Sequence, residues 1–310
     1  MGRRDLVLLT DHSSTEGSRD VLATAVRTLT GRAPVHLDAR HFMDGGSGRI
    51  EPADDPDDPD GLRLTADGRT VTAETVIVYE IPPHRRRAFA DCQRQLRAYG
   101  ARSLGTDPEA WRAATEKDRT VARFARDGVP QMPSVVLSRP SPGVAAEAFQ
   151  RLGGDVWARP CVGMGGEDVF HVTTSTQLDA VARHYAEAGA DWLIARDARN
   201  FLPDGRRHQY RVVVLRGTVV RAVEHVQADP DAPCNECRGA VSTLLEVDEL
   251  PDGLAKSAIF AAESLGLELA GVDLAAESGG VVFEVNVHPA FGQRALEQVA
   301  LPYVAAHLAP

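Results

Sequence analysis

The chain has 310 residues, a formal net charge of -10 and 43% hydrophobic residues. This length exceeds what one small core organises, so two or three subdomains are expected. The acidic balance argues against a nucleic-acid surface, because a basic face supplies most of that affinity. No apolar run approaches the ~20 residues that a membrane-spanning helix needs, so no membrane segment is predicted.

The first hundred residues alternate short apolar runs with stretches of helical periodicity. Strands are expected at residues 6–10, 35–37 and 76–79, and helices at 18–29 and 85–99. A small hairpin is also expected at residues 62–71. This alternation predicts an open α/β layer over residues 1–106.

The last of these helices opens with the basic run His84-Arg85-Arg86-Arg87. Cations oppose the macrodipole at a helix N-terminus. Ligands bind open α/β sheets just past the strand ends, so Arg85 and Arg86 are candidate ligands for an acidic substrate. The alternative is a solvated basic turn.

Two further features concern the environment of the chain. The run at residues 51–60 is acidic and broken by prolines, which predicts a loop. The four cysteines are scattered, and the N-terminus leads directly into a strand pattern without a signal peptide. A reducing, cytoplasmic compartment is therefore expected.

The remaining elements also alternate. Helices are expected at residues 107–125, 144–152, 176–187, 254–265 and 293–308. Strands are expected at 135–137, 156–159, 169–172, 192–195, 210–215 and 218–226.

A glycine-rich loop containing Gly163, Gly165 and Gly166 lies between two predicted strands. It is neither a P-loop nor a Rossmann fingerprint, since both of these need a helix N-terminus. Its backbone N–H groups could still fold over a polyphosphate, although a plain tight turn fits equally well. Lys117 and Arg159 are the cations expected to face such phosphates; Arg159 ends a strand just before the loop, so its guanidinium should point to where the loop closes.

Arg211 is a single cation in an otherwise apolar strand and needs a partner if it is buried. An anionic substrate is one candidate, and an ion pair with Glu224 or Glu246 is the other. Downstream, residues 234–239 form a polar loop with a CxxC pattern. It lacks the second ligand pair of a zinc site, so its function is expected to rest on Asn235 and Arg238.

A hairpin is predicted near the end of the chain, with apolar runs at 269–276 and 281–287. Its turn would set Asp273 opposite Glu284, with Asn286 on the same face as Glu284. Opposed like charges destabilise a sheet, and all-oxygen ligands suit Mg²⁺ or Mn²⁺. The pattern predicts a divalent-cation site on these three residues; the alternative is a surface hairpin whose charges face water.

Together these pieces resemble a known family. The stretch 261–292 is similar to the ending of ATP-grasp ligases. The branch in question is typified by the ribosomal protein S6 glutamate ligase and by lysine-biosynthesis ligases that act on a carrier protein. The similarity extends back to Lys117, which matches the first nucleotide-binding lysine. It implies the ATP-grasp fold, of class α+β/α/β: a pre-domain over 1–106, and central (107–190) and C-terminal (191–310) subdomains that sandwich a nucleotide.

The resemblance also implies roles for single residues. Asn235 and Gly239 match an acceptor loop, which with Arg85, Arg86 and Arg238 completes the expected substrate-binding set. Arg159 stands where the family usually has lysine, and Gln209 where it often has aspartate. The residues expected to act in catalysis are Arg211, Asn286 and Arg159. The residues expected to bind the nucleotide are Lys117, Arg159, Gly163, Gly165, Gly166, Asp197 and the backbone of Leu193, Ile194 and Ala195.

The implied activity is ATP-dependent joining of a carboxylate to an amine through an acyl phosphate, with release of ADP and phosphate. ATP and two Mg²⁺ or Mn²⁺ ions would serve an amino acid or peptide substrate, in a dimer or tetramer. Alternatives are a macrocyclase of a precursor peptide, an intramolecular cyclo-ligase, and a nucleotide-binding regulator without turnover. A redox or zinc protein using Cys234 and Cys237 is a further alternative.

Overall fold

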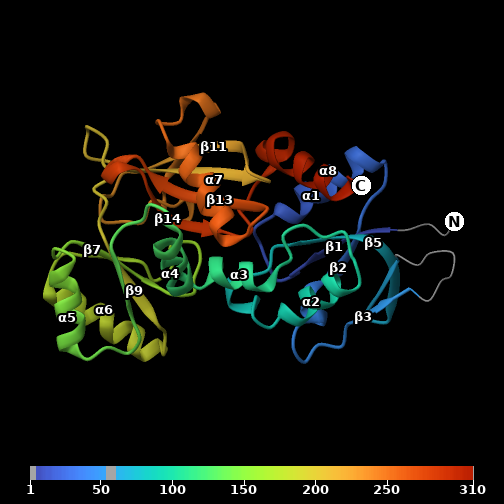
Figure 1. Cartoon of the computed structure of the whole chain (residues 1–310), viewed down its shortest axis with the longest axis horizontal. Helices are drawn as coiled ribbons and strands as arrows, with labels where there is room; N and C mark the ends of the chain where they lie inside the picture. The colour runs from blue at the N-terminus through green and yellow to red at the C-terminus, as the bar shows by residue number, and fades with distance from the viewer. Residues whose placement is uncertain (1–4, 54–60, 310) are drawn as a thin grey trace. The chain divides into compact units, whose positions relative to one another are not determined.

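The computed structural model describes residues 5–53 and 61–309 of the chain (Figure 1). Most of the acidic loop predicted at 51–60 lies outside these residues. The chain forms two compact units, and the boundaries predicted at residues 106 and 190 stay predictions. Unit 1 comprises Met1–Arg112, Gly266–Leu269 and His288–Pro310, and unit 2 comprises Ala113–Leu265 and Ala270–Val287.

Unit 1 contains the predicted α/β layer. Its sheet has the order β2-β1-β5-β4-β3, with β1 parallel to β2 and β5. Helices α1 and α8 pack against each other. The elements are β1 (Asp5–Thr10), α1 (Ser18–Thr30), β2 (Val35–Asp38), β3 (Arg49–Pro52), β4 (Leu62–Ala66), β5 (Arg69–Tyr79), α2 (Ala90–Ala98) and α8 (Leu301–Leu308).

The C-terminal segment of the chain belongs to the core of unit 1. Tyr303 and Val304 of α8 are buried, at 3% and 0% exposure. The hydroxyl of Tyr79, at the end of β5, donates a hydrogen bond to the Pro289 carbonyl oxygen over 2.8 Å. The last residues therefore complete the packing of the first sheet.

Three predicted elements of unit 1 need correction. β5 is one strand of 11 residues, where a hairpin arm and a separate strand were expected. The helix expected from residue 85 begins only at Ala90, because a short 3-10 turn, Pro83–Arg85, precedes it. The helix expected over 293–308 reaches regular α form only at Leu301, after 3-10 and π turns.

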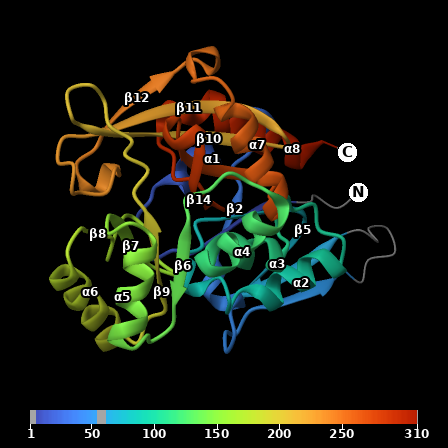
Figure 2. The ribbon, with the colours of Figure 1, turned by 60° about the vertical axis from the view of Figure 1, so that its left-hand side comes forward.

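The first sheet of unit 2 is antiparallel, with the order β6-β9-β7-β8. Helices α5 and α6 pack side by side (Figures 1 and 2), and apolar residues of both helices and of the sheet form one buried cluster. The elements are β6 (Ser134–Leu137), α5 (Pro142–Arg151), β7 (Val156–Pro160), β8 (Phe170–Val172), α6 (Ser175–Ala188) and β9 (Trp192–Arg196).

The second sheet of unit 2 has the order β12-β11-β10-β13-β14. Helix α7 contacts β10, β11 and β14. A second apolar cluster, which includes Leu193 of β9 and Ala275 of β13, joins the two sheets of this unit. The elements are β10 (Arg207–Leu215), β11 (Thr218–Gln227), β12 (Val241–Leu245), α7 (Leu254–Leu265), β13 (Leu269–Ala275) and β14 (Val281–Asn286).

Two features here differ from expectation. The helix expected over 107–125 is two helices, α3 (Pro108–Thr115) and α4 (Lys117–Asp127). They break at Glu116, whose ψ of 100° is extended, and the Lys117 N–H donates to the Cys161 carbonyl oxygen over 2.9 Å. Strand β12, at the sheet edge in Figure 2, was not predicted, because most of its side chains on both faces are exposed and show no clear alternation.

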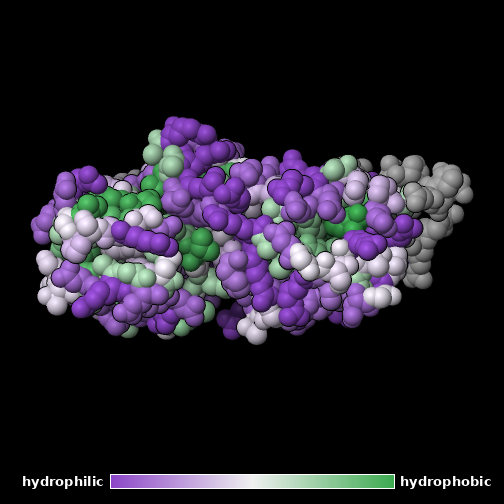
Figure 3. All heavy atoms as spheres, turned by 90° about the horizontal axis from the view of Figure 1, so that it is seen from below, coloured by the Kyte–Doolittle hydropathy of each residue, from purple (hydrophilic) through white to green (hydrophobic). Residues whose placement is uncertain are grey.

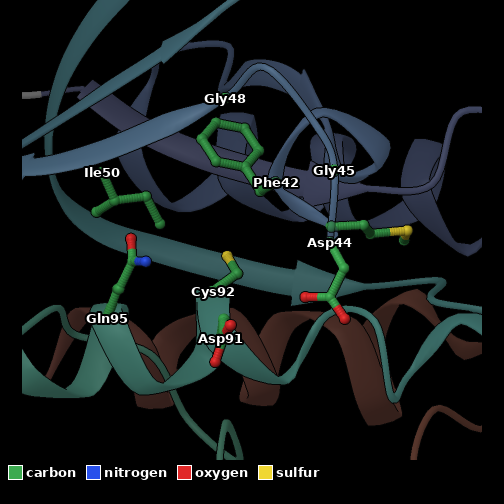
Figure 4. A pocket seen from close by; sticks show the side chains of 9 residues that line it. Phe42, Asp44, Gly45, Gly48, Ile50, Asp91, Cys92 and Gln95 are labelled. Carbon is green, nitrogen blue, oxygen red and sulfur yellow. The ribbon is translucent and has the colours of Figure 1, made fainter.

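The surface shows no large apolar region on the face drawn in Figure 3, where hydrophobic atoms form separate small areas. No helix among residues 5–53 and 61–309 is long and apolar enough to cross a bilayer. A cavity of about 290 Å³ lies in unit 1. Phe42 and Ile50 contribute apolar walls to it, and Asp44 and Asp91 contribute carboxylates (Figure 4). None of the predicted site residues lines it.

Candidate active site

The hairpin register predicted from the sequence is confirmed. Strands β13 and β14 pair antiparallel, with Asp273 opposite Glu284 and Gly271 opposite Asn286. A bulge follows Asp273. The Asn286 side-chain amide donates to Asp273 Oδ2 over 3.2 Å. Asp273 is 5% exposed, whereas Glu284 and Asn286 are half-buried, so the hairpin brings three oxygen-bearing side chains together in a partly buried place.

Glu284 has two cationic neighbours from other elements. Lys117 Nζ, at the start of α4, lies 2.9 Å from Glu284 Oε1, and Arg159 Nη1 of β7 lies 3.9 Å from Oε2. Arg159 Nη2 also donates to the Phe283 carbonyl oxygen over 2.8 Å. The expectation that Arg159 points to the glycine-rich loop is therefore wrong, since its guanidinium points to β14.

Arg211 of β10 forms a two-pronged ion pair with Asp273. Its Nε and Nη2 donate to the two carboxylate oxygens over 2.7 and 2.8 Å. The partners proposed from the sequence, Glu224 and Glu246, are wrong. Glu224 accepts from the His208 ring instead, on the other face of the sheet. Residues 62 apart in the chain thus share one charge pair.

These contacts tune the charges of the site. Burial alone would raise the pKa of Glu284, but Lys117 and Arg159, followed by Arg211, lower it below its ordinary value. Burial would lower the pKa of the Arg211 guanidinium, but Asp273 raises it above its ordinary value. Burial lowers the pKa of Arg159, although a guanidinium keeps its charge at any physiological pH. The site therefore sets three basic side chains against two carboxyl groups.

The glycine-rich loop meets the predicted acceptor loop. Gly166 has a φ of +70°, and a Cβ atom there would lie 3.2 Å from Arg238 Cγ and 3.3 Å from Pro233 Cβ. Asn235 Oδ1 accepts from the Cys237 N–H over 2.9 Å, and Gly239 has a φ of +92°. Glycine is required at this contact because both space and backbone conformation are restricted.

The other two glycines of the loop differ in how closely their neighbours approach. Gly165 also has a positive φ, of +64°, but a Cβ atom there would meet nothing within 4 Å. A Cβ atom at Gly163 would meet the Pro160 ring at 2.9 Å. The CxxC cysteines in the facing loop are both free, with Cys234 buried and Cys237 exposed. Burial raises the pKa of the Cys234 thiol to about 12, which disfavours thiolate chemistry there.

The residues expected near adenine and ribose have partners within unit 2. Strand β9 pairs with β6 on one edge and β7 on the other, so Leu193, Ile194 and Ala195 lie inside the sheet. Contact of adenine with their backbone stays a prediction. Asp197 accepts from Arg207 over 2.7 and 3.1 Å. Burial acts to raise the pKa of Asp197, but Arg207 lowers it below its ordinary value.

Arg207 is a residue that the sequence analysis missed. It is 2% exposed, and its guanidinium lies over the Trp157 ring at 4.9 Å and the Phe201 ring at 4.4 Å. The ring of His171 stacks on Trp157 and bridges two further carboxylates, Asp155 at 2.8 Å and Asp231 at 2.6 Å. The basic run Arg206-Arg207-His208 was the available signal, but only the tertiary structure identifies which member is buried.

Arg85 and Arg86 both have partners within unit 1. Arg85 Nη1 lies 2.5 Å from Asp11 Oδ2 and 3.0 Å from Ser13 Oγ. Arg86 Nε donates to the Ile81 carbonyl oxygen over 2.9 Å, and its guanidinium lies 5.9 Å from the centre of the Trp111 ring. Their role toward a substrate stays a prediction.

Much of the chain is similar to known proteins. Residues 130–300, more than half of the chain, match the family described as the prokaryotic glutathione synthetase ATP-grasp domain. The chain belongs to this ATP-grasp family. It is 25% identical over 240 residues to a glutathione synthetase of Rhodopseudomonas palustris, covering 76% of this chain and 71% of that protein. It is 28% identical over 198 residues to a probable alpha-L-glutamate ligase of an Enterobacter species, covering 63% of each.

The glutamate-ligase branch expected from the sequence is supported further by a ribosomal protein bS6–L-glutamate ligase of Salmonella paratyphi B, 27% identical over 63% of both chains. Among solved structures, the ATP-grasp ligase PsnB, determined with a minimal precursor, superimposes with a TM-score of 0.67. The superposition covers 99% of this chain and 98% of PsnB, with 16% sequence identity. This likeness confirms the ATP-grasp fold. The expected class, an ATP-dependent ligase that forms C–N bonds, is confirmed by these relatives.

Proposed function

We propose that this ATP-grasp ligase activates the carboxylate of an amino acid or peptide with ATP and joins it to an amine at the β13–β14 hairpin. The observation that carries the proposal is the hairpin register, with Asp273 opposite Glu284. Three cations, Lys117, Arg159 and Arg211, face these carboxylates from three other elements. The carboxylates are complementary in charge to magnesium ions, and the three cations are complementary to the phosphates of ATP.

The donor set fits a hard divalent cation. Asp273, Glu284 and Asn286 offer only oxygen donors besides the amide nitrogen, and two of them are opposed carboxylates. When bound, two Mg²⁺ ions would neutralise phosphate charge and orient the transferred phosphoryl group. Lys117, Arg159 and Arg211 would exchange carboxylate oxygens for phosphate oxygens, and arginine suits this because it binds phosphate through two parallel hydrogen bonds.

The reaction needs no covalent intermediate on the protein. A carboxylate oxygen of the substrate attacks the γ-phosphorus, and ADP leaves. The amine then attacks the acyl carbon of the acyl phosphate, and phosphate leaves. Arg211 would offset charge that develops on the transferred phosphoryl group and on the acyl oxygen, so its contribution would be electrostatic stabilisation and positioning.

Phosphate release from Mg-ATP, measured against single amino acids, dipeptides and hydroxy acids, tests the proposal. Release stimulated by a carboxylate and an amine together supports it. The variant Glu284→Gln should lose this stimulation, and Glu147→Gln, at an exposed position on α5, should keep it. ATP binding without stimulated release by any substrate would instead favour the nucleotide-binding regulator.

A peptide substrate is the second candidate, favoured by the likeness to PsnB over nearly the whole chain. Peptides that carry acidic side chains together with lysine, serine or threonine serve as its test. Loss of one water from such a peptide, read by mass spectrometry, would indicate a macrocyclase. Phosphate release with free amino acids alone would favour the amino-acid ligase. Light scattering on the purified protein tests the expected dimer or tetramer.

A further inference from the structure

One ring nitrogen near the site has no hydrogen-bond partner among residues 5–53 and 61–309. His225 of β11 is 4% exposed, and its Nε2 atom is buried without a hydrogen bond. Most buried polar atoms in folded proteins are hydrogen-bonded, because an unpaired one has lost its contact with water without a replacement. The buried Nε2 atom of His225 is therefore unusual, and a role in binding or catalysis would account for it.

The strand register places His225 on the site face of the sheet. His225 pairs with Gln209 and Val223 pairs with Arg211, so the four side chains alternate onto one face. Arg211 on that face holds Asp273. His225 and Arg211 are diagonal neighbours, within reach of long side chains. His208 lies on the opposite face and bridges two glutamates there.

The hydrogen bonds of the ring fix its tautomer. His225 Nδ1 lies 2.7 Å from Ser242 Oγ, and Ser242 Oγ donates its proton to Glu236 Oε1. A hydroxyl has one proton, and an ionised carboxylate only accepts. Ser242 must therefore accept from the Nδ1–H of the imidazole. The neutral ring then carries its lone pair on Nε2, the unpartnered atom.

The surroundings keep the ring neutral. Burial, followed by the charge of Arg211, lowers the pKa of His225, and Asp273 and Glu236 oppose this only in part. The thiol of Cys234 donates to the His225 carbonyl oxygen over 3.1 Å, and Gln209 opposite is uncharged. Within the described part of the chain, no carboxylate accepts from Nε2 itself. A neutral imidazole with a free lone pair is a proton acceptor.

We propose that His225 is the general base of the amide-forming step. The inference rests on the proposed ligase function. An acceptor that arrives as an ammonium ion cannot attack until it loses a proton. Its N–H bond breaks as the Nε2–H bond forms, and the freed lone pair attacks the acyl carbon. The acyl carbon–oxygen bond to phosphate then breaks, the departing phosphate takes the second nitrogen proton, and the imidazolium later releases its proton to water.

Replacing the acceptor amine by hydroxylamine distinguishes a general-base role of His225 from a structural one. It is a weaker base than an alkyl amine and is unprotonated at neutral pH, so it traps the acyl phosphate without a general base. The substrate carboxylate with the highest phosphate release would be used with hydroxylamine or with the best amine. In His225→Asn, amide formation should fall by about 10²- to 10⁴-fold while hydroxamate formation stays within about threefold.

His208→Asn is the matched control, since it removes an equally buried histidine from the opposite face. It should leave the ratio of amide to hydroxamate unchanged. If His225→Asn fails to fold, Ser242→Ala tests the same chain of hydrogen bonds and should lower amide formation selectively but less. Ser242→Ala would act by removing the hydrogen bond that fixes the tautomer of the His225 ring.

Two results would overturn the proposal. Equal loss of amide and hydroxamate in His225→Asn would mean that the ring only supports the structure, and no loss of either would mean that it does not take the proton. Failure of the wild type to form hydroxamate with any carboxylate would instead reject the ligase function, and the base role with it. The two failures are thus distinguishable.

Discussion

Replacing Glu284 by glutamine removes one charge from the site and keeps the shape of the side chain. Lys117, with its side chain 9% exposed, would then lose the carboxylate at 2.9 Å, and Arg159 would lose the one at 3.9 Å. Breaking a buried ion pair costs about 3–5 kcal/mol, and breaking an exposed one about 0–1 kcal/mol. Glu284 itself is 30% exposed. We therefore expect a loss of about 1–3 kcal/mol in the free energy of unfolding of unit 2.

This loss should depend on pH in a defined direction. The pKa of Glu284 is lowered in the folded protein from a starting value of 4.5. A depressed folded pKa gives stability that is fully present above the unfolded pKa and is lost as the pH falls through the folded value. The difference between wild type and Glu284→Gln should thus be constant above about pH 5.5 and shrink below pH 4.5.

Urea unfolding followed by tryptophan fluorescence measures this difference, because Trp157 and Trp192 both belong to unit 2. In parallel, ADP release should fall by more than about 100-fold, which corresponds to almost 3 kcal/mol of lost transition-state stabilisation. A variant as stable as the wild type at pH 7.5 would contradict the ion-pair reasoning. A variant that releases ADP at the wild-type rate would contradict the metal assignment.

Three further predictions concern the loops and cations of the site. Arg159→Lys keeps the charge and should raise the KM for ATP by no more than about tenfold, whereas Arg159→Ala should raise it by more than about 100-fold, as steady-state kinetics will show. Gly166→Ala should weaken ATP binding more than Gly165→Ala in calorimetry, because both strain a positive φ by about 1 kcal/mol but only the first crowds its neighbours. Replacing Cys234 and Cys237 together by serine should leave turnover within about threefold of the wild-type rate. Complete loss of turnover would instead support the redox or zinc alternative.

The hairpin could be predicted because its information is local. Alternation along β14 puts Glu284 and Asn286 on one face, and a short turn sets the register that places Asp273 opposite. The partners of these residues could not be predicted. Lys117 and Arg211 come from a helix and a strand that are distant in sequence, and either carboxylate of the hairpin was an equally good partner for each.

Other misses have local causes. The break between α3 and α4 falls at Glu116, which is a good helix former, and it depends on a bond from the Lys117 N–H to the distant Cys161 carbonyl. The role of His225 is invisible in the sequence because a lone histidine in a strand is unremarkable. Its meaning depends on Ser242, which only the pairing of β11 with β12 brings opposite it.

The order of synthesis differs from the order in which the units can be completed. Residues 288–310 belong to unit 1, and Tyr303 and Val304 fill its core. Domains of a nascent chain usually fold in the order in which they emerge. Here residues 1–112 cannot complete the core of unit 1 until residues 288–310 have been synthesised. Unit 2 already has all of its residues once Val287 has left the ribosome. A premature stop shortly after Val287 would therefore damage the beginning of the protein more than its middle.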